Sequence, residues 1–185
     1  MTITLRPARE SDAPALTALL LRNREHFRSG EPRRPEGYFS PAHQRKALRA
    51  AERAAAEGVA HLFLIEEGRE LIGRAQLNSV VRGAFQSASI AYAVDREHTG
   101  RGVATDAVRQ LIDRAFGPLA LHRLQAEVLP GNAASRAVLE ACAFTGYGRA
   151  DRYLFLDGQW QDMDLFQLIN DHFVQADAVR AVSRG

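Results

Sequence analysis

Two glycines, Gly100 and Gly102, stand where a predicted strand gives way to a predicted helix, and this arrangement is suited to binding phosphate. Apolar residues alternate over 87–94, which predicts a strand, and recur with a helical period over 102–116. Glycine has no Cβ, so the backbone between the two elements can turn tightly and approach a ligand closely. The chain around these glycines is therefore the first candidate for a binding site.

The opening turn of the predicted helix supplies the chemistry of this site. Backbone N–H groups in a first helical turn have no partner within the helix and carry the positive end of its dipole, so together they can hold a pyrophosphate. The residues that would contribute are Gly100, Gly102, Val103, Ala104 and Thr105. Arg101 would add a positive charge beside the anion. The alternative is a tight strand-to-helix turn that binds nothing.

Two other phosphate-binding loops do not fit this pattern. No Gly-Lys-Ser/Thr is present, which excludes a nucleotide-binding P-loop. The third glycine of a dinucleotide-binding fingerprint is missing, and Asp106 comes too soon after the glycines to bind a ribose.

The elements around this site predict an α/β domain with a mixed sheet rather than a regular βαβ repeat. The predicted strands are 2–6, 59–65, 71–77, 87–94, 121–128, 147–156 and 164–169. The predicted helices begin at Ser11-Asp12, at Ser40-Pro41, at Gly102 and at Asn132. The segment 23–40 contains two prolines and cannot form one continuous helix. We expect a single domain over 1–170, followed by a C-terminal tail over 171–185.

Composition narrows the class of protein. The chain has 185 residues, enough for one core, and its 24 basic and 22 acidic residues nearly balance, so we expect no direct nucleic-acid binding. The single cysteine, Cys142, cannot form an internal disulfide, and we expect it inside a helix as part of the core. We find no signal peptide and no apolar run of ~18 residues, which predicts a cytoplasmic protein without a membrane span. His98 and His122 lack the spacing of metal ligands, so we expect no metal.

The segment 100–107, Gly-Arg-Gly-Val-Ala-Thr-Asp-Ala, resembles the acetyl-CoA-binding segment of the GNAT acetyltransferase superfamily. The resemblance implies the GNAT acyl-CoA N-acyltransferase fold, with acetyl-CoA as the co-substrate and with a splayed fourth strand. It also implies that a backbone N–H near Val94 stabilises the oxyanion. Thr99 stands where the family usually carries Gln or Arg, and we count it among the cofactor-binding residues.

A second segment, 121–140, is similar to the family's fifth strand and the helix after it. Asn132 and Ser135 are also a good helix start, because the asparagine side chain can accept a hydrogen bond from the N–H of residue 134 or 135. The resemblance implies that both residues lie near the pantetheine arm and thiol of the cofactor. The family usually continues to Gly-Phe, where this chain has Ala143-Phe144.

The hairpin at Asp157-Gly158 with Trp160-x-Asp162 resembles the Rim-type subgroup, which acetylates ribosomal proteins. The subgroup's Glu-Pro is also present, with Gly30 in place of its usual tryptophan. The resemblance implies that the acceptor is the N-terminal α-amino group of a protein. A small-molecule amine (an amino acid, polyamine or antibiotic) and a non-catalytic acyl-CoA-binding module are the alternatives. Homodimers are common among relatives, although the sequence identifies no dimer surface.

Glu127 is the candidate catalytic base. It stands five residues before Asn132, where some N-terminal acetyltransferases of the family carry their glutamate. It also falls in an apolar strand, where partial burial favours a carboxylate that takes up a proton near neutral pH. The alternative is an ion pair with Arg123 or Arg136, which would make Glu127 purely structural.

Ser135 is the candidate acid for the leaving thiolate. A serine hydroxyl is a poor acid, so a hydrogen bond to the thiolate is the alternative role. Tyr147 is the reserve for this step. The reserve acids near the acceptor cleft are Asp151, Asp157 and Asp162.

Overall fold

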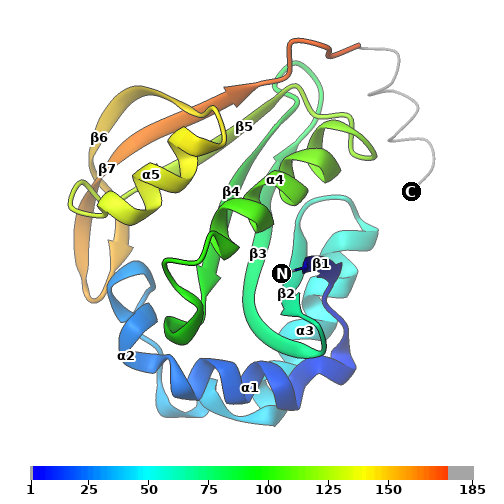
Figure 1. Cartoon of the computed structure of the whole chain (residues 1–185), viewed down its shortest axis with the longest axis vertical. Coiled ribbons are helices and arrows are strands. Elements are labelled where there is room, and N and C mark those ends of the chain that lie inside the picture. Colours follow the sequence, from blue (N-terminus) through cyan, green and yellow to red (C-terminus); the bar gives the residue numbers. More distant parts are fainter. Residues whose placement is uncertain (1, 175–185) are drawn as a thin grey trace.

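The computed structural model describes residues 2–174 as an α/β fold with one mixed sheet (Figure 1). The strands are β1 (Ile3–Pro7), β2 (His61–Glu67), β3 (Glu70–Val81), β4 (Ser87–Val94), β5 (Arg123–Val128), β6 (Thr145–Leu156) and β7 (Gln159–Ile169). The helices are α1 (Ala13–Arg22), α2 (Arg24–Phe27), α3 (Pro41–Ala56), α4 (Val103–Phe116) and α5 (Ala133–Ala141). Short 3₁₀ turns complete the described chain, among them η4 (Arg96–His98).

The sheet has the order β1-β2-β3-β4-β5-β7-β6, and only the β4–β5 pair is parallel. That pair is short, because Ser87–Ser89 pair with Arg123–Gln125 and the register then ends. Beyond this point the two strands diverge, as Figure 1 shows. The divergence leaves the facing backbone of both strands free, so the centre of the sheet opens into a V.

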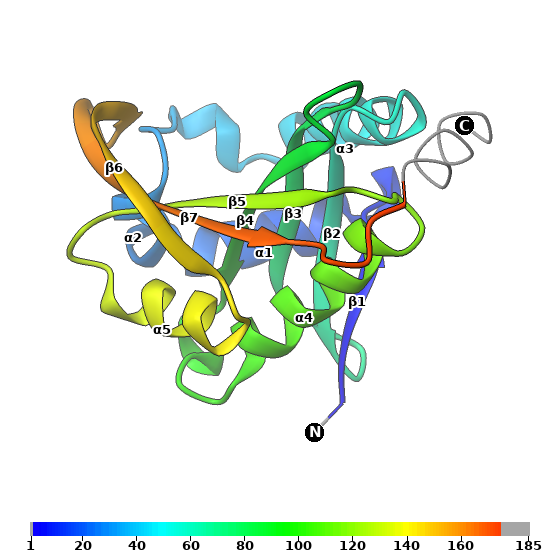
Figure 2. The ribbon, with the colours of Figure 1, turned by 90° about the horizontal axis from the view of Figure 1, so that it is seen from above.

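Helices cover both faces of the sheet (Figure 2). α4 and α5 lie on one face, where Leu111 and Leu139 are fully buried against the strands. α1 and α3 contact β3 and β2 on the opposite face, where Leu19 and Leu48 form a second core. The sheet therefore lies between two layers of helices, each packed on its own hydrophobic core.

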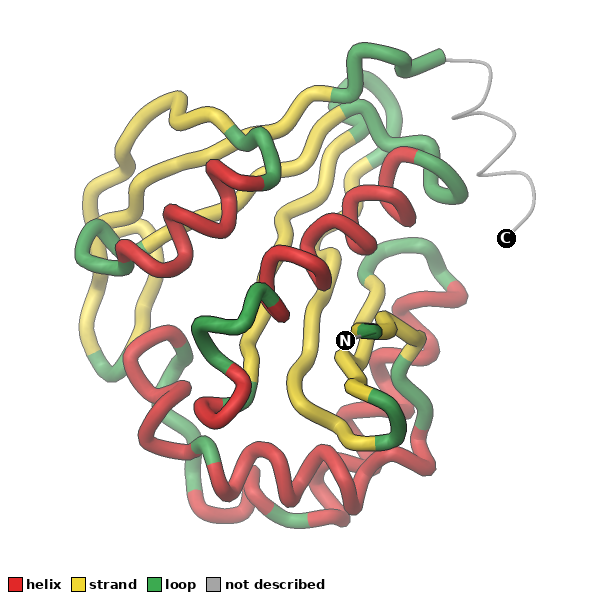
Figure 3. Tube along the Cα trace, in the orientation of Figure 1, coloured by secondary structure: helices red, strands yellow, loops and turns green. Residues whose placement is uncertain are grey.

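The predicted elements are confirmed with shifted ends. The segment between α1 and α3 consists of short helical turns and loops, as its prolines predicted (Figure 3). β7 begins at Gln159 rather than at 164, because the polar residues after the hairpin pair directly with β6. Asp12 is the N-cap residue of α1, but its carboxylate binds Arg6 and the N–H of Arg9 rather than an N–H of the first turn of that helix.

Cys142 is buried, as predicted, but it follows the last residue of α5 as its C-cap rather than lying inside the helix. Part of the predicted tail, residues 175–185, lies outside the described residues. Within residues 2–174, no helix is long and apolar enough to cross a membrane.

Candidate active site

The strand-to-helix turn has the geometry that the two glycines predicted. Gly100 and Gly102 have φ angles of 72° and 80°, in the left-handed region that favours glycine. Gly102 is the N-cap of α4 and has no side chain to bond the first helical turn. The N–H groups of that turn are therefore available to an anion.

The loop before these glycines is anchored from the other side of the sheet. The side chain of Asn23, at the end of α1, accepts a hydrogen bond from the backbone N–H of Arg96 at 2.9 Å. Arg22 Nε donates to the carboxylate of Asp95 at 2.5 Å. Burial opposes ionisation of Asp95, but the bonds from Arg22 and from the N–H of Glu97 lower its pKa overall. The carboxylate thus stays charged and holds the turn in place.

A cleft of about 1000 Å³ runs from this turn into the V between β4 and β5. The predicted cofactor-binding residues that line it are Val94, Thr99, Gly100, Gly102, Val103, Ala104, Thr105 and Asn132. The structure thus brings residues of two separate segments to one surface.

Arg101 is not among the described residues that line the cleft. Its guanidinium lies 3.4 Å from Glu67, at the end of β2, so its side chain is directed toward that carboxylate. The hydroxyl of Thr99 donates to the carbonyl of Arg96 at 2.8 Å and so supports the turn itself. A side-chain contact from either residue to an anion stays a prediction.

A second pocket, of about 650 Å³, opens on the sheet face that α4 and α5 do not cover, and Glu127 lies in it. Ser89 Oγ donates to Glu127 Oε2 at 2.6 Å. Glu127 is the one charged side chain among the described residues that line this pocket. A single carboxylate among neutral groups is suited to accept a proton from an amine.

The ion-pair alternative for Glu127 is not realised in the described chain. Arg136 pairs with Asp164 at 2.5 Å instead, and Arg123 lies over the ring of Tyr147. Glu127 is half-buried and keeps Ser89 as its hydrogen-bond donor.

The two pockets meet at a junction. The residues that line both are Gly30, Ala91, Tyr92, Leu129, Asn132 and Ser135. Asn132 caps α5 by accepting the N–H of Ser135 at 3.0 Å, which confirms the predicted helix start. The hydroxyl of Ser135 lies 2.9 Å from that of Tyr92. A group bound in the first pocket can therefore meet a group bound in the second at this point.

The reserve acids are placed elsewhere or committed to ion pairs. Asp157 is held by Arg28 and Arg33, and these arginines lower its pKa. Asp162 binds the backbone N–H of Arg152 and the side chain of Arg149, which lower its pKa. These two carboxylates stabilise the hairpin of β6 and β7.

Tyr147 and Asp151 are also absent from the lining of either pocket within the described chain. The Tyr147 hydroxyl accepts a hydrogen bond from Gln125 at 2.8 Å. Neither residue is placed to protonate a group at the junction.

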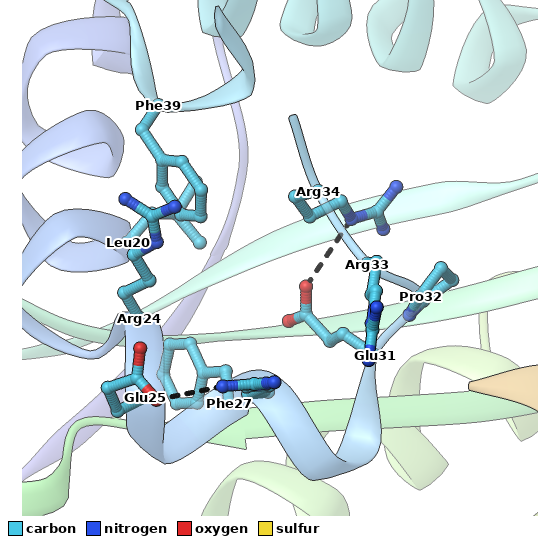
Figure 4. A pocket seen from close by; sticks show the side chains of 10 residues that line it. Leu20, Arg24, Glu25, Phe27, Glu31, Pro32, Arg33, Arg34 and Phe39 are labelled. Carbon is cyan, nitrogen blue, oxygen red and sulfur yellow. Dashed lines mark ion pairs between the residues drawn. The ribbon is translucent and has the colours of Figure 1, made fainter. Parts of the chain in front are cut away.

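The segment 28–34 covers the junction and is fixed to the sheet. Glu31 pairs with Arg74 of β3, and Arg34 faces the same carboxylate (Figure 4). The carbonyl of Glu31 accepts the N–H of Asp157, at the tip of the β6–β7 hairpin, at 3.1 Å. Bonds to β3 and to the tip of the β6–β7 hairpin therefore fix Glu31, the neighbour of Gly30, which lines both pockets.

Four residues with a clear place in the site were not predicted: Ser89, Tyr92, Glu31 and Arg74. Two of them had a usable signal: Glu31 belongs to the Glu-Pro of the resemblance to the Rim-type subgroup, and Tyr92 is a hydroxyl-bearing aromatic residue in the otherwise apolar alternation of β4. The partners of the others are distant in the sequence. In the part of the chain that the structure describes, no three His, Cys, Asp or Glu side chains are arranged to hold a metal ion.

A family model and a similar protein both identify an N-acetyltransferase. The family model described as "Acetyltransferase (GNAT) domain" matches residues 2–145. The probable N-acetyltransferase YjcK of Bacillus subtilis is 36% identical over 172 residues, which cover 91% of this chain and 94% of the relative.

Two solved structures are similar over nearly the whole chain. The ribosomal-protein-S5-alanine acetyltransferase of Vibrio fischeri has a TM-score of 0.90 and 30% identity, covering 94% of this chain and 96% of that one. RimJ of Mycobacterium smegmatis, in complex with CoA-disulfide, has a TM-score of 0.88 and 33% identity, covering 99% and 89%.

The chain belongs to the GNAT acetyltransferase family. It is an acetyl-CoA-dependent N-acetyltransferase, and its relatives include Rim-type enzymes.

Proposed function

We propose that this enzyme acetylates the N-terminal α-amino group of a protein, with ribosomal proteins as the first class to test. The observation that carries the proposal is the chemistry of the second pocket, where Glu127 is the one charged side chain among the described lining residues. The name of the similar ribosomal-protein-S5-alanine acetyltransferase of Vibrio fischeri supports the same acceptor class.

The charge of this pocket disfavours two small-molecule alternatives. A free amino acid carries a carboxylate next to its amine, and no Arg or Lys is present among the lining residues to bind it. A polyamine carries several ammonium groups, and one carboxylate cannot pair with all of them. A protein N-terminus has one amine and an amide in place of the carboxylate, so it matches the single charge of Glu127.

The mouth of the pocket favours an acceptor with more than an amine. Three of its lining side chains are exposed: Val81, Phe85 and Tyr153 are 45%, 49% and 45% exposed. An apolar rim that continues from the reacting position is a surface for the residues that follow the first one of a polypeptide.

The proposed mechanism assigns Glu127 to the proton of the amine and the Ser135 hydroxyl to the leaving sulfur, which takes its own proton from solvent. Glu127 takes the proton of the attacking amine, directly or through the hydroxyl of Ser89. A backbone N–H near Val94 stabilises the oxyanion that forms on the thioester carbonyl. The C–S bond then breaks, and Ser135 Oγ donates a hydrogen bond to the leaving sulfur. An α-amine, with a pKa of ~7.7–8.0, needs only this modest base, whereas a lysine at ~10.4 needs more.

The proposal also includes the bounds of the domain and the location of the reaction. We propose that residues 1–170 form the acetyltransferase domain and that 171–185 form its tail; the last strand ends at Ile169, which supports this division. A ribosomal-protein acceptor would place the reaction in the cytoplasm.

The test is CoA release with matched acceptors. Short peptides that start with Ala, Ser or Met are compared with the same peptides carrying a blocked N-terminus, and with free alanine and spermidine. Release with the free peptides alone supports the proposal. Faster release with alanine or spermidine would favour the small-molecule alternative, and CoA binding without release from any amine would favour a non-catalytic module.

A further inference from the structure

The hydroxyl of Tyr92 spans the open V at the junction. Tyr92 lies on β4 and Ser135 on α5, 43 positions apart in the sequence, and the two side chains come from opposite walls of the cofactor cleft. The Tyr92 hydroxyl lies 2.9 Å from Ser135 Oγ and 3.2 Å from the Ser135 carbonyl oxygen. This is the hydrogen bond that joins the two walls where the cofactor's thiol is expected.

We propose that Tyr92 is a positioning residue for acetyl transfer: it directs the proton of Ser135 toward the sulfur of the leaving CoA. The inference rests on the proposed function, because it assumes that the thioester lies at the junction. Tyr92 itself acts through Ser135.

The two hydroxyls have two protons and share one hydrogen bond. When Tyr92 donates to Ser135 Oγ, the Ser135 proton is free to bond a third atom at the junction. When Ser135 donates to Tyr92, the remaining proton of Tyr92 is directed to the Ser135 carbonyl instead. A negative sulfur favours the first arrangement, because charge-assisted hydrogen bonds are the stronger ones.

Tyr92 remains protonated while it does this. Burial raises the pKa of Tyr92 to about 12, although the bond to Ser135 opposes the shift. Neither hydroxyl gives up its proton in this proposal: Ser135 donates a hydrogen bond to the thiolate, and Tyr92 donates one to Ser135 Oγ. The sulfur takes its proton from solvent, and the proton of the amine goes to Glu127.

The most direct test uses the binary complex with CoA and needs no acceptor. The pKa of the bound thiol is measured from the ultraviolet absorbance of its thiolate, with desulfo-CoA as the blank. We expect Tyr92→Phe to raise the pKa of the bound thiol by about one unit, which corresponds to a tenfold change. Tyr147→Phe is the control, because that hydroxyl lines neither pocket. Equal thiol pKa values in the wild type and Tyr92→Phe would overturn the inference.

Ser135→Ala is the second variant and protects the test against a folding defect in Tyr92→Phe. It removes the group through which Tyr92 acts, so it should raise the thiol pKa at least as much. A thiol pKa that Ser135→Ala leaves unchanged would also refute the proposal.

Kinetics separate this inference from the proposed function. On an accepted peptide, Tyr92→Phe should lower kcat about tenfold and leave the KM for acetyl-CoA unchanged. In a Ser135→Ala background, the same change should lower kcat less than about twofold, since the two residues act as one unit. Equal losses of kcat in both backgrounds would refute the role of Tyr92 and leave the proposed acceptor untouched. A wild type that acetylates no peptide would sink the proposed acceptor, and the thiol titration would still decide the inference.

Discussion

The cofactor cleft and the second pocket, which we propose binds the acceptor, are built in different ways, although they share a junction. We call the second one the acceptor pocket. The cleft depends on one continuous turn, 99–105, and its main groups are backbone N–H groups at the start of α4. The acceptor pocket is formed by side chains from β3, β4, β5 and β6. A site made of backbone is tolerant of side-chain changes other than at its glycines, whereas a site made of side chains can change its acceptor one residue at a time.

The largest expected effect separates the two regions by chemistry. Glu127→Gln should lower kcat/KM for a peptide about 100- to 1000-fold, because it removes the base, with little change in CoA affinity. Steady-state kinetics measure kcat/KM for the peptide, and a thermal-shift titration with CoA measures the affinity for CoA. Glu140→Gln, an exposed change on α5, is the control. A loss in CoA affinity that matches the loss in rate would show that Glu127 is not a base.

The next largest effect tests the turn at the start of α4. Gly102→Ala should weaken CoA binding about tenfold, since a non-glycine residue at positive φ costs ~1–2 kcal/mol and strains the turn that holds the anion. Gly58→Ala is a matched control, because Gly58 has a φ of 69°, is equally uncrowded and lies outside the cleft. Both variants should lose stability, and only the first should lose CoA affinity by calorimetry. Equal CoA affinities would remove the turn from the cofactor site.

A smaller effect tests the rim of the acceptor pocket. Phe85→Ala should raise the KM for a peptide a few-fold by removing apolar contact, and should leave the KM for acetyl-CoA unchanged. Phe155→Ala, on a residue that is similarly exposed and lies outside the pocket lining, should change neither constant. If Phe155→Ala affects the peptide as much as Phe85→Ala does, the acceptor contacts the hairpin rather than the rim.

The smallest effect concerns stability rather than the site. Burial, with a contribution from Arg82, lowers the pKa of His61 below its usual 6.5. The unfolded chain therefore takes up this proton at a higher pH than the folded chain does, so stability is complete above pH 6.5 and falls as the pH drops below it. Urea unfolding at several pH values should show a weaker decline for His61→Gln than for His26→Gln. Parallel declines would contradict this assignment.

Sequence reasoning located the strand-to-helix turn of the cofactor cleft because the information for it is local. Two glycines, a strand and a helical period lie within one short segment, and each has a defined backbone consequence. The same holds for Asn132, whose cap is formed with a residue three positions away.

The acceptor half could not be derived in the same way. Glu127 was placed on a strand, but its partner Ser89 stands 38 positions earlier in the sequence. Glu31 and Arg74 are 43 positions apart, and only the folded sheet brings them together. Arg101 was expected to add its charge beside the anion. Nothing in the sequence indicated that its guanidinium lies 3.4 Å from Glu67, which stands 34 positions earlier at the end of β2.

The central claim is that an α-ammonium group loses its proton to Glu127 and then attacks the thioester as a neutral amine. The most direct test is one peptide that carries both a free N-terminus and an internal lysine, incubated with enzyme and acetyl-CoA near neutral pH. Fragmentation mass spectrometry then locates the acetyl group. The account predicts acetylation of the α-amine and none of the lysine. Acetylation of the lysine, or of neither amine while free spermidine is modified, would contradict it.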